Sequence, residues 1–372
     1  MSEVYAARRT RLRDQYGAAG SAAALVCGPA NVRYLAGGAP PGASLLLGPE
    51  GDVLLYPPVP EDGGPGSRVD EGLRTIVCER SSDTALCAAR LLAESGTGAG
   101  AAGPLAVEED HLTVARHRAL AAAAPGVALT DLGRAVEQLR VVKDEEEISR
   151  LRIAAEIADQ ALGELLESIL VGRTERHLAL ELERRLVDHG ADGPAFRTSV
   201  ATGPHSGRAA HRPTDRRVEE GDFLTVRLGA EYRGYRCGVA RTFVIGTAPA
   251  DWQIELYELV FAAQRAGREA LAPGVGCRDV DRTVRQRLTA AGHAEALDPV
   301  TGRGVGLEFA EEPQLAPGSM GKLDACVPVT VGPGVHLPGR GGVRIDDTLV
   351  VRPEADGGPE LLTITTKELL AL

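Results

Sequence analysis

The chain has 372 residues, and its 41 lysines and arginines against 52 aspartates and glutamates give a net charge of −11. With 44% hydrophobic and 25% charged residues, its composition is that of a globular protein rather than a disordered one, and its length favours two domains. The excess of negative charge argues against a protein that binds nucleic acid or an anionic membrane, because both need a basic surface.

Neither a membrane span nor a metal-binding or redox cysteine motif is expected. Apolar runs such as residues 22–27 are much shorter than a membrane-spanning helix, and residues 1–16 carry charges where a secretory signal has an apolar block. None of the six cysteines belongs to a Cys-x-x-Cys pair or to a Cys/His cluster, so neither structural zinc nor a redox dithiol is indicated. These features favour a cytoplasmic location.

The first 142 residues have the pattern of a small α/β domain. Short apolar runs that suit strands alternate with helical stretches, and the turn-forming residues 48–52 join two of the strands in a hairpin. The expected strands are residues 22–27, 43–47, 53–56 and 105–107, the expected helices are residues 82–94 and 112–123, and a Gly/Ala loop is expected at 96–104.

The pattern changes near residues 140–143, which predicts two domains, residues 1–142 and 143–372. The acidic run 144–147 suits the start of a long helix, because carboxylates are favourable at the positive end of the helix dipole. Apolar residues then recur every three or four positions along one helical face: Ile148, Leu151, Ala155, Ala158, Leu162, Leu165 and Ile169.

The second domain alternates helices with pairs of strands, which predicts an α+β fold. Thr174 is the expected N-cap of a helix that ends at Gly190, because a threonine hydroxyl can accept from a free backbone N–H of the first turn. Further helices are expected around residues 256–263 and at 279–290, and strands at 223–228, 235–245 and 343–351.

Four polar or glycine-rich blocks stand out in the second domain: residues 211–222, 234–243, 302–307 and 337–347. In this order they resemble the family of Xaa-Pro aminopeptidase, prolidase and creatinase. Residues 31–37, Asn-Val-Arg-Tyr-Leu-Ala-Gly, and residues 142–148 also resemble blocks of that family. The resemblance covers nearly the whole chain. It implies a pita-bread C-terminal domain, a smaller creatinase-like N-terminal α/β domain, and a homodimer.

The chain departs from the metal-dependent members of that family at the positions that hold two metal ions with Asp, Asp, His, Glu and Glu. Those five positions are matched here by Arg227, Gly238, Arg303, Gly332 and Asp346. Carboxylates and imidazole bind divalent ions, whereas guanidinium groups repel them. The resemblance with this departure therefore predicts no metal and no other cofactor.

Two interpretations of the arginines are open. Arg227 and Arg303 with Asp346 sum to a charge of +1, so the pair of arginines suits an anionic substrate such as a carboxylate. Alternatively, the arginines form ion pairs with Asp346 and nearby glutamates and only fill a site that has lost its activity.

His211 occupies the place of the histidine that takes part in proton transfer in creatinase, and an imidazole is a natural general acid or base near neutral pH. The alternative is an ordinary half-buried histidine. As a hypothesis, Tyr235 and Glu308 assist as auxiliary substrate-binding residues beside Arg227, Arg303 and Asp346. Arg241 is expected to be structural, paired with a carboxylate behind the site.

Creatinase itself fits poorly, because its substrate-binding glutamates fall on Ala240 and Gly332, and residues 235–243 are more similar to ectoine hydrolase, another metal-free member. The first functional hypothesis is a metal-independent hydrolase or lyase that acts on a C–N bond of a small carboxylate-bearing molecule, with His211 as the acid/base. The second is a catalytically inactive domain similar to aminopeptidase P that is used for binding.

Overall fold

A computed structural model describes residues 2–58, 69–79, 83–95, 103–168 and 171–372. The chain forms two compact units, residues 1–140 and 141–372. None of the helices in this described part combines the length and the apolar character that crossing a membrane requires.

The N-terminal unit is built on one mixed sheet with the strand order β4-β3-β2-β1-β5-β6. Strands β1, β2 and β3 are antiparallel neighbours, and β4, β5 and β6 are added in parallel. The strands are β1 (Ala23–Val26), β2 (Ser44–Gly48), β3 (Gly51–Tyr56), β4 (Arg74–Val77), β5 (Leu105–Val107) and β6 (Leu129–Asp131). The helices are α1 (Ser2–Ala18), α2 (Pro29–Ala36), α3 (Thr84–Ser95), α4 (Val114–Ala123) and α5 (Ala135–Arg140), with a 3-10 turn η1 at Glu109–His111.

The block at residues 31–37 has a structural role in this unit. Buried Asn31 on α2 donates to the carboxylates of Glu108 and Glu137, both at 2.7 Å, and accepts from Arg140 Nη1 at 2.6 Å. Gly37 ends α2 at φ 79°, a conformation that strongly favours glycine. This part of the resemblance therefore concerns packing within the N-terminal unit.

The C-terminal unit begins with two helices and continues with long strands. Its helices are α6 (Glu145–Ser168), α7 (Glu175–Asp188), α8 (Asp251–Glu269) and α9 (Cys277–Ala290). Its strands are β7 (Gly193–Pro194), β8 (Ser199–Thr202), β9 (Phe223–Tyr232), β10 (Tyr235–Val244), β11 (Gly302–Gly304), β12 (Glu311–Leu315), β13 (Pro328–Val331), β14 (Gly334–Leu337), β15 (Gly341–Arg344), β16 (Asp347–Val350) and β17 (Glu360–Leu361). Its 3-10 turns are η2 (Gly203–Gly207), η3 (Ala294–Ala296) and η4 (Glu354–Asp356).

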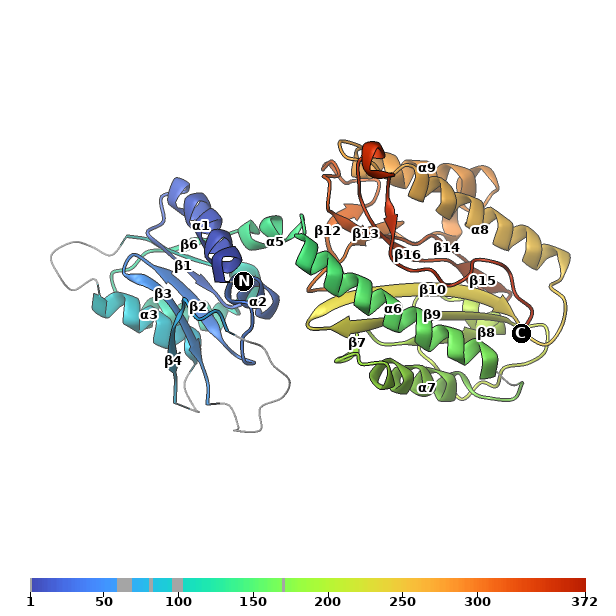
Figure 1. Ribbon diagram of the computed structural model, residues 1–372, viewed down its shortest axis with the longest axis horizontal. Coiled ribbons are helices and arrows are strands. Elements are labelled where there is room, and N and C mark those ends of the chain that lie inside the picture. The colour runs from blue at the N-terminus through green and yellow to red at the C-terminus, as the bar shows by residue number, and fades with distance from the viewer. Residues whose placement is uncertain (1, 59–68, 80–82, 96–102, 169–170) are drawn as a thin grey trace. The chain divides into compact units, whose positions relative to one another are not determined.

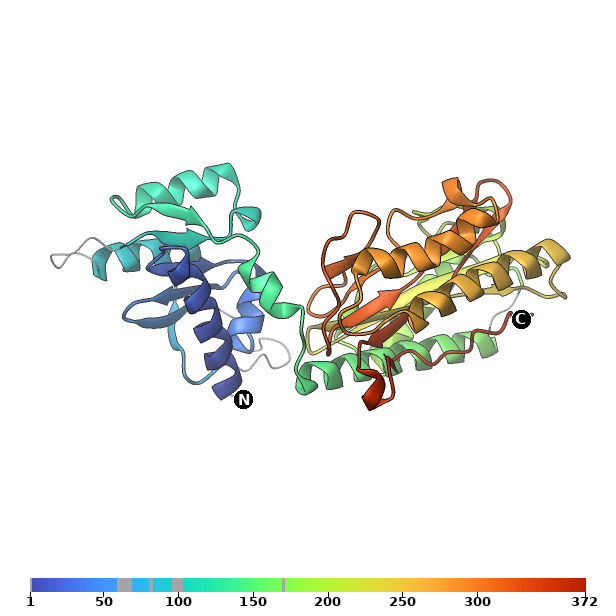
Figure 2. The ribbon, with the colours of Figure 1, turned by 90° about the horizontal axis from the view of Figure 1, so that it is seen from above.

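The hairpin of β9 and β10 is the longest strand pair of the C-terminal unit. Its register sets Arg227 opposite Ala240 and Gly229 opposite Gly238, so these four residues share one face, because directly opposed residues of an antiparallel pair point to the same side. Helix α6 lies along this hairpin in both views (Figures 1 and 2).

A second sheet, with the order β12-β11-β13-β16-β17, lies beside α8 and α9 (Figure 1). Buried aliphatic side chains of both helices and of β13 and β16 form the main core of the unit, which includes Val260, Val284, Val329 and Leu349. A backbone bridge between Ala240 of β10 and Asp346 joins the hairpin to this second sheet. The segment that carries Asp346 is thereby brought to the hairpin.

The expected elements are present, with one clear difference. Residues 343–351 form two strands, β15 and β16, because the chain leaves β15 at Ile345 and Asp346 and pairs with a different partner strand afterwards. Thr174 caps α7 as expected and accepts from His177 N at 3.2 Å. Residue 82, residues 96–102 and Ile169 lie outside the described part of the chain.

Arg241 holds the two sheets of the C-terminal unit together. Its guanidinium donates to Asp347 Oδ1 at 2.7 Å, and both side chains are fully buried. It also donates to the backbone carbonyl oxygens of Asp346 at 2.7 Å and of Thr365 at 2.8 Å. Arg241 is thus a structural residue paired with a carboxylate, as its position in the sequence indicated.

Arg241→Met should lower the free energy of unfolding by about 3 kcal/mol, because it leaves the buried carbonyl oxygens of Asp346 and Thr365 without this donor and leaves Asp347 with only the weaker pairs to Lys367 and Arg268 that the structure describes. Urea denaturation at neutral pH measures this loss. Arg265→Met is the matched control, since the exposed Arg265 pairs with Glu269 one turn along α8, and it should change stability by less than about 0.5 kcal/mol. Equal losses in the two variants would contradict the role of Arg241.

Candidate functional site

Three arginines and two aspartates of the C-terminal unit form an arginine cluster, defined as Arg227, Arg303, Arg344, Asp298 and Asp346. Arg227 lies on β9, Arg303 on β11 and Arg344 at the end of β15. Asp346 Oδ1 lies 2.8 Å from Arg344 Nε, and its Oδ2 lies 3.5 Å from Arg227 Nε. Arg344 also forms an ion pair with Asp298. The structure therefore brings together three of the predicted site residues: Arg227, Arg303 and Asp346.

Two phenylalanines cover the guanidinium groups of this cluster. The rings of Phe196 and Phe309 lie 4.0 Å apart between centroids. The guanidinium carbon of Arg227 lies 4.8 Å from the centre of Phe196, and that of Arg303 lies 4.3 Å from the centre of Phe309. Such contacts are favourable for a cation, and they keep water away from one side of each guanidinium.

The cluster holds more positive than negative charge. Three guanidiniums against two carboxylates leave +1, with His336 counted as neutral. Burial, followed by repulsion from Arg344, lowers the pKa of Arg227 to about 10, although Asp346 opposes the shift. Burial also lowers the pKa of Arg303. Both shifts arise chiefly from burial, which disfavours the charged form of a guanidinium.

Two of the nitrogen donors of Arg303 form no hydrogen bond with the described residues. Its Nε and Nη2 atoms are inaccessible to solvent and have no hydrogen-bond partner within the described ranges. Arg227 Nε is in the same state, because its approach to Asp346 is an ion pair without hydrogen-bond geometry. An anion with two acceptor oxygens would satisfy the parallel N–H groups of Arg303.

The residues at the five positions compared with the metal-dependent relatives do not fit a pair of divalent ions. A Cβ atom at Gly238 would lie 2.8 Å from Phe196 and 2.9 Å from Phe309. A Cβ atom at Gly332 would lie 2.2 Å from Asp346 Oδ1. The space for carboxylates at these two positions is thus occupied by the protein's own side chains, and two of the remaining three positions are guanidiniums.

His211 belongs to a different group of side chains, with Glu175 and His205. His211 Nε2 lies 2.8 Å from Glu175 Oε2, and His205 Nδ1 lies 2.9 Å from Glu175 Oε1. Burial alone would raise the pKa of the Glu175 carboxyl, but hydrogen bonds from Thr202 and Thr214 outweigh it and leave this pKa below its ordinary value. No interaction described for the imidazole of His211 joins it to the arginine cluster.

The contacts described for the other two predicted residues, Tyr235 and Glu308, involve residues outside the arginine cluster. The buried Tyr235 donates from its hydroxyl to Glu147 Oε1 on α6 at 2.8 Å, and Arg150 lies over its ring. Glu308 is exposed, and its backbone N–H donates to Glu311 Oε1 at 2.9 Å. Neither contact involves Arg227, Arg303 or Asp346.

Sequence reasoning missed Phe196, Phe309, Asp298 and Glu175. One signal was available for the two phenylalanines, because the chain has only five, and aromatic residues make up 3% of it. The composition shows that phenylalanine is rare in this chain, but only the fold shows that two of the five lie side by side. Asp298 and Glu175 carried no such signal.

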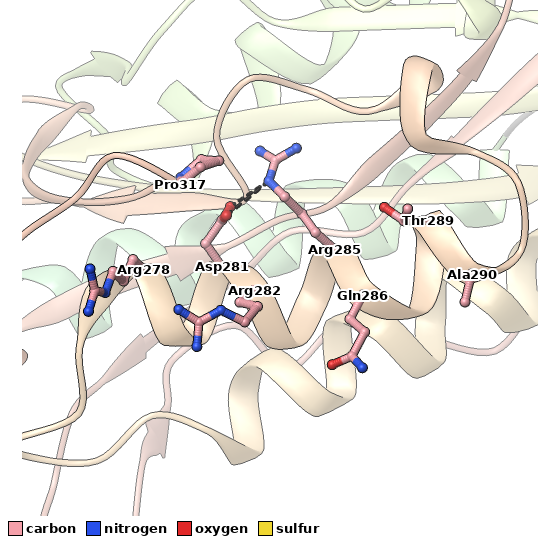
Figure 3. A pocket seen from close by; sticks show the side chains of 8 residues that line it. All are labelled: Arg278, Asp281, Arg282, Arg285, Gln286, Thr289, Ala290 and Pro317. Atoms are coloured by element: carbon pink, nitrogen blue, oxygen red, sulfur yellow. Dashed lines mark hydrogen bonds and ion pairs between the residues drawn. The ribbon is translucent and has the colours of Figure 1, made fainter.

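A groove of about 500 Å³ lies along α9, and none of the residues that line it belongs to the groups described above (Figure 3). Figure 3 shows Asp281 and Arg285 pointing toward one another, and their side chains form an ion pair at 2.9 Å. Arg285 also donates to the backbone oxygens of Asp298 and Pro299. This arrangement anchors the loop that leads to β11, and the groove includes no residue of the arginine cluster.

Comparison with known proteins identifies both units. The model of metallopeptidase family M24 matches residues 149–353, and that of the creatinase/prolidase N-terminal domain matches residues 8–142. An Xaa-Pro dipeptidase of Pyrococcus furiosus is 36% identical over 63% of this chain and 66% of its own length, just under two thirds. An uncharacterized peptidase of Bacillus subtilis is 34% identical over 72% of this chain and 75% of its own length. The solved structure of an Xaa-Pro dipeptidase from Bacillus anthracis superposes with a TM-score of 0.90 at 30% identity, over 99% of this chain and all of that one.

These findings confirm the fold prediction, an α+β pita-bread domain after a smaller creatinase-like α/β domain. They do not support a likeness to the metal-free branch with creatinase and ectoine hydrolase. These relatives are Xaa-Pro dipeptidases and a peptidase, and a prolidase from Pyrococcus furiosus superposes with a TM-score of 0.82 at 27% identity.

The prediction of a metal-independent hydrolase or lyase is therefore wrong. The matched family is one of metallopeptidases, and Glu175, His205 and His211 form a group of side chains that could hold a metal ion. The prediction rested on five positions only, whereas the fold brings a carboxylate and two imidazoles together elsewhere.

Asp298→Asn should lower the free energy of unfolding at pH 7 by about 2 kcal/mol. Burial alone would raise the pKa of Asp298, but the hydrogen bond with His336 and the charge of Arg344 outweigh it and hold the pKa at about 2, against 3.8 for a free side chain. Because the folded-state pKa is depressed, this stabilisation is present above about pH 4 and is lost as the pH falls toward 2.

Urea denaturation of the unchanged protein and of Asp298→Asn between pH 7 and pH 3 tests this expectation. Asp215→Asn is the control, since Asp215 is highly exposed and pairs with the exposed Arg176. The difference caused by Asp298→Asn should shrink below pH 4, while the control shows almost none. A difference that stays constant with pH would contradict the charge pairing of Asp298.

Proposed function

The chain belongs to metallopeptidase family M24, and on that premise we propose that its C-terminal domain, residues 143–372, binds a short peptide or a similar small molecule through a carboxylate. The arginine cluster is the proposed binding site. Arg303 and Arg227 contact the carboxylate, and Asp346 holds Arg227 and Arg344 in place.

One observation carries the proposal: the unused Nε and Nη2 donors of Arg303, which lie on the same edge of the guanidinium. Two parallel N–H groups match the two oxygens of a carboxylate, which is the strongest geometry for an arginine–carboxylate pair. The side chain of Arg227 is 27% exposed, so solvent reaches the edge of the cluster, and a ligand reaches the buried Nε and Nη2 donors of Arg303 once the side chains around them move.

The names of the relatives agree with this ligand class. An Xaa-Pro dipeptidase acts on a peptide of two residues, and a free dipeptide always ends in a carboxylate. The net charge of +1 in the cluster supports an anionic group. A neutral or cationic group would leave the surplus guanidinium charge uncompensated in a partly dehydrated site.

The proposed activity is binding of a carboxylate-bearing ligand, without a hydrolytic step. The residues of the arginine cluster do not fit a pair of divalent ions, and His211, the predicted acid/base, has its Nε2 committed to Glu175. The second candidate function, a domain that binds without hydrolysis, is favoured by the phenylalanines that fill the space beside Gly238. The roles predicted for His211, Tyr235 and Glu308, the homodimer and the cytoplasmic location stay predictions.

Calorimetric titration with the dipeptide Gly-Pro tests the proposed site. Arg303→Met should weaken binding about 10- to 100-fold, as expected for the loss of a charged hydrogen bond. Arg265→Met should bind like the unchanged protein, and the C-terminal amide of Gly-Pro should bind weakly to all three.

Unchanged affinity in Arg303→Met, or equal binding of the amide, would overturn the carboxylate site. Release of proline, followed in the same samples with and without added Mn²⁺ or Zn²⁺, separates the two candidate functions. Release would indicate a peptidase, and binding without release would indicate a binding domain.

A further inference from the structure

Glu175, His205 and His211 form a three-residue group outside the arginine cluster, and we propose that this group binds a divalent transition metal such as Zn²⁺. One nitrogen of each imidazole and one carboxylate oxygen of Glu175 all lie within 4.8 Å of one another. The proposal is independent of the carboxylate site, because the two groups share no residue. It also concerns none of the five positions compared with the metal-dependent relatives.

The three side chains come from segments that the backbone fixes to one another. Glu175 is the first residue of α7, His205 lies on η2, and His211 lies in the loop that follows. Two backbone hydrogen bonds attach that loop to the start of α7. Glu175 N donates to Arg216 O and Arg176 N donates to Thr214 O, both at 3.0 Å. The geometry of the group is thus set by the fold before any ion arrives.

The donor set suits zinc. Two imidazole nitrogens and a carboxylate are a known ligand combination for this ion, with metal–ligand distances of about 2.0–2.2 Å. Ligand atoms around a tetrahedral ion at that distance lie roughly 3.3 Å apart. His205 Nδ1 lies 2.9 Å from Glu175 Oε1 and His211 Nε2 lies 2.8 Å from Glu175 Oε2, so the imidazoles contact different carboxylate oxygens, and an ion would replace these two hydrogen bonds.

Other hydrogen bonds orient the carboxylate of Glu175. Thr202 N donates to Oε1 at 2.9 Å, and Thr214 donates to Oε2 from its backbone N at 2.9 Å and from its hydroxyl at 2.7 Å. Such outer hydrogen bonds are typical of metal sites, because they hold the ligand in one orientation. The Glu175 side chain is fully buried, whereas that of His205 is 19% exposed, so an ion would enter from the side of His205.

A second group of this kind in the N-terminal unit, Glu108, His111 and Glu137, is less suitable. It offers a single imidazole, and His111 Nε2 lies 3.6 Å from Glu137 Oε1. This group therefore serves as the matched control.

Titration of the metal-stripped protein with Zn²⁺ alone, by calorimetry, tests the site. The unchanged protein should bind one Zn²⁺ ion, and His205→Gln should lower the affinity for that ion at least tenfold. His111→Gln and Arg303→Met should bind that ion as before, and the Arg303→Met result separates this proposal from the carboxylate site. Co²⁺ in place of Zn²⁺ should give a visible absorption band that His205→Gln removes.

Thermal unfolding of the same proteins supplies the second measurement, because an ion that binds only the folded state raises the melting temperature. Zn²⁺ should raise it for the unchanged protein and for His111→Gln, and not for His205→Gln. The proposal is wrong if the unchanged protein shows neither binding nor a shift. It is also wrong if His111→Gln loses the ion and His205→Gln keeps it.

Discussion

The buried surplus of guanidinium charge around Asp346 is the constraint on which the proposed site depends. Arg227 and Arg344 approach this carboxylate from two sides, at 3.5 and 2.8 Å. Asp346 itself is fixed through the backbone, because its carbonyl oxygen accepts from the buried Arg241 and its segment forms a bridge with Ala240. The fold thus holds an arrangement that repels further cations and leaves donors of Arg303 for an anion.

Close packing explains why small residues surround this charge. Gly238 faces Phe196 and Phe309, and Gly332 faces Asp346, at distances that leave no room for a side chain. The two phenylalanines also cover the arginines, so one feature fills the space of missing carboxylates and dehydrates the cations. The chain belongs to a family of metallopeptidases, yet two of its five compared positions are arginines and two are glycines. The carboxylate and imidazoles that could hold a metal ion, those of Glu175, His205 and His211, lie at other positions.

Much of the fold was predictable from the sequence, because it rests on local patterns. The apolar stripe of α6 and the threonine cap of α7 depend on residues only a few positions apart. The hairpin of β2 and β3 likewise follows from its turn. The break between β15 and β16 was not predictable, because it depends on which distant strand each half pairs with. Within the candidate site, Arg227, Arg303 and Asp346 came from the family resemblance. Phe309 and Glu175 were not identified from the sequence, because only the folded chain brings them to their partners.

A crystal structure of the protein grown with Gly-Pro is the most direct test of the central claim, that the surplus charge of the arginine cluster receives a carboxylate. The account predicts density for a carboxylate whose two oxygens face Nε and Nη2 of Arg303. A dipeptide bound with its carboxylate away from both Arg303 and Arg227 would contradict it, as would an arginine cluster closed by a further acidic side chain of the protein.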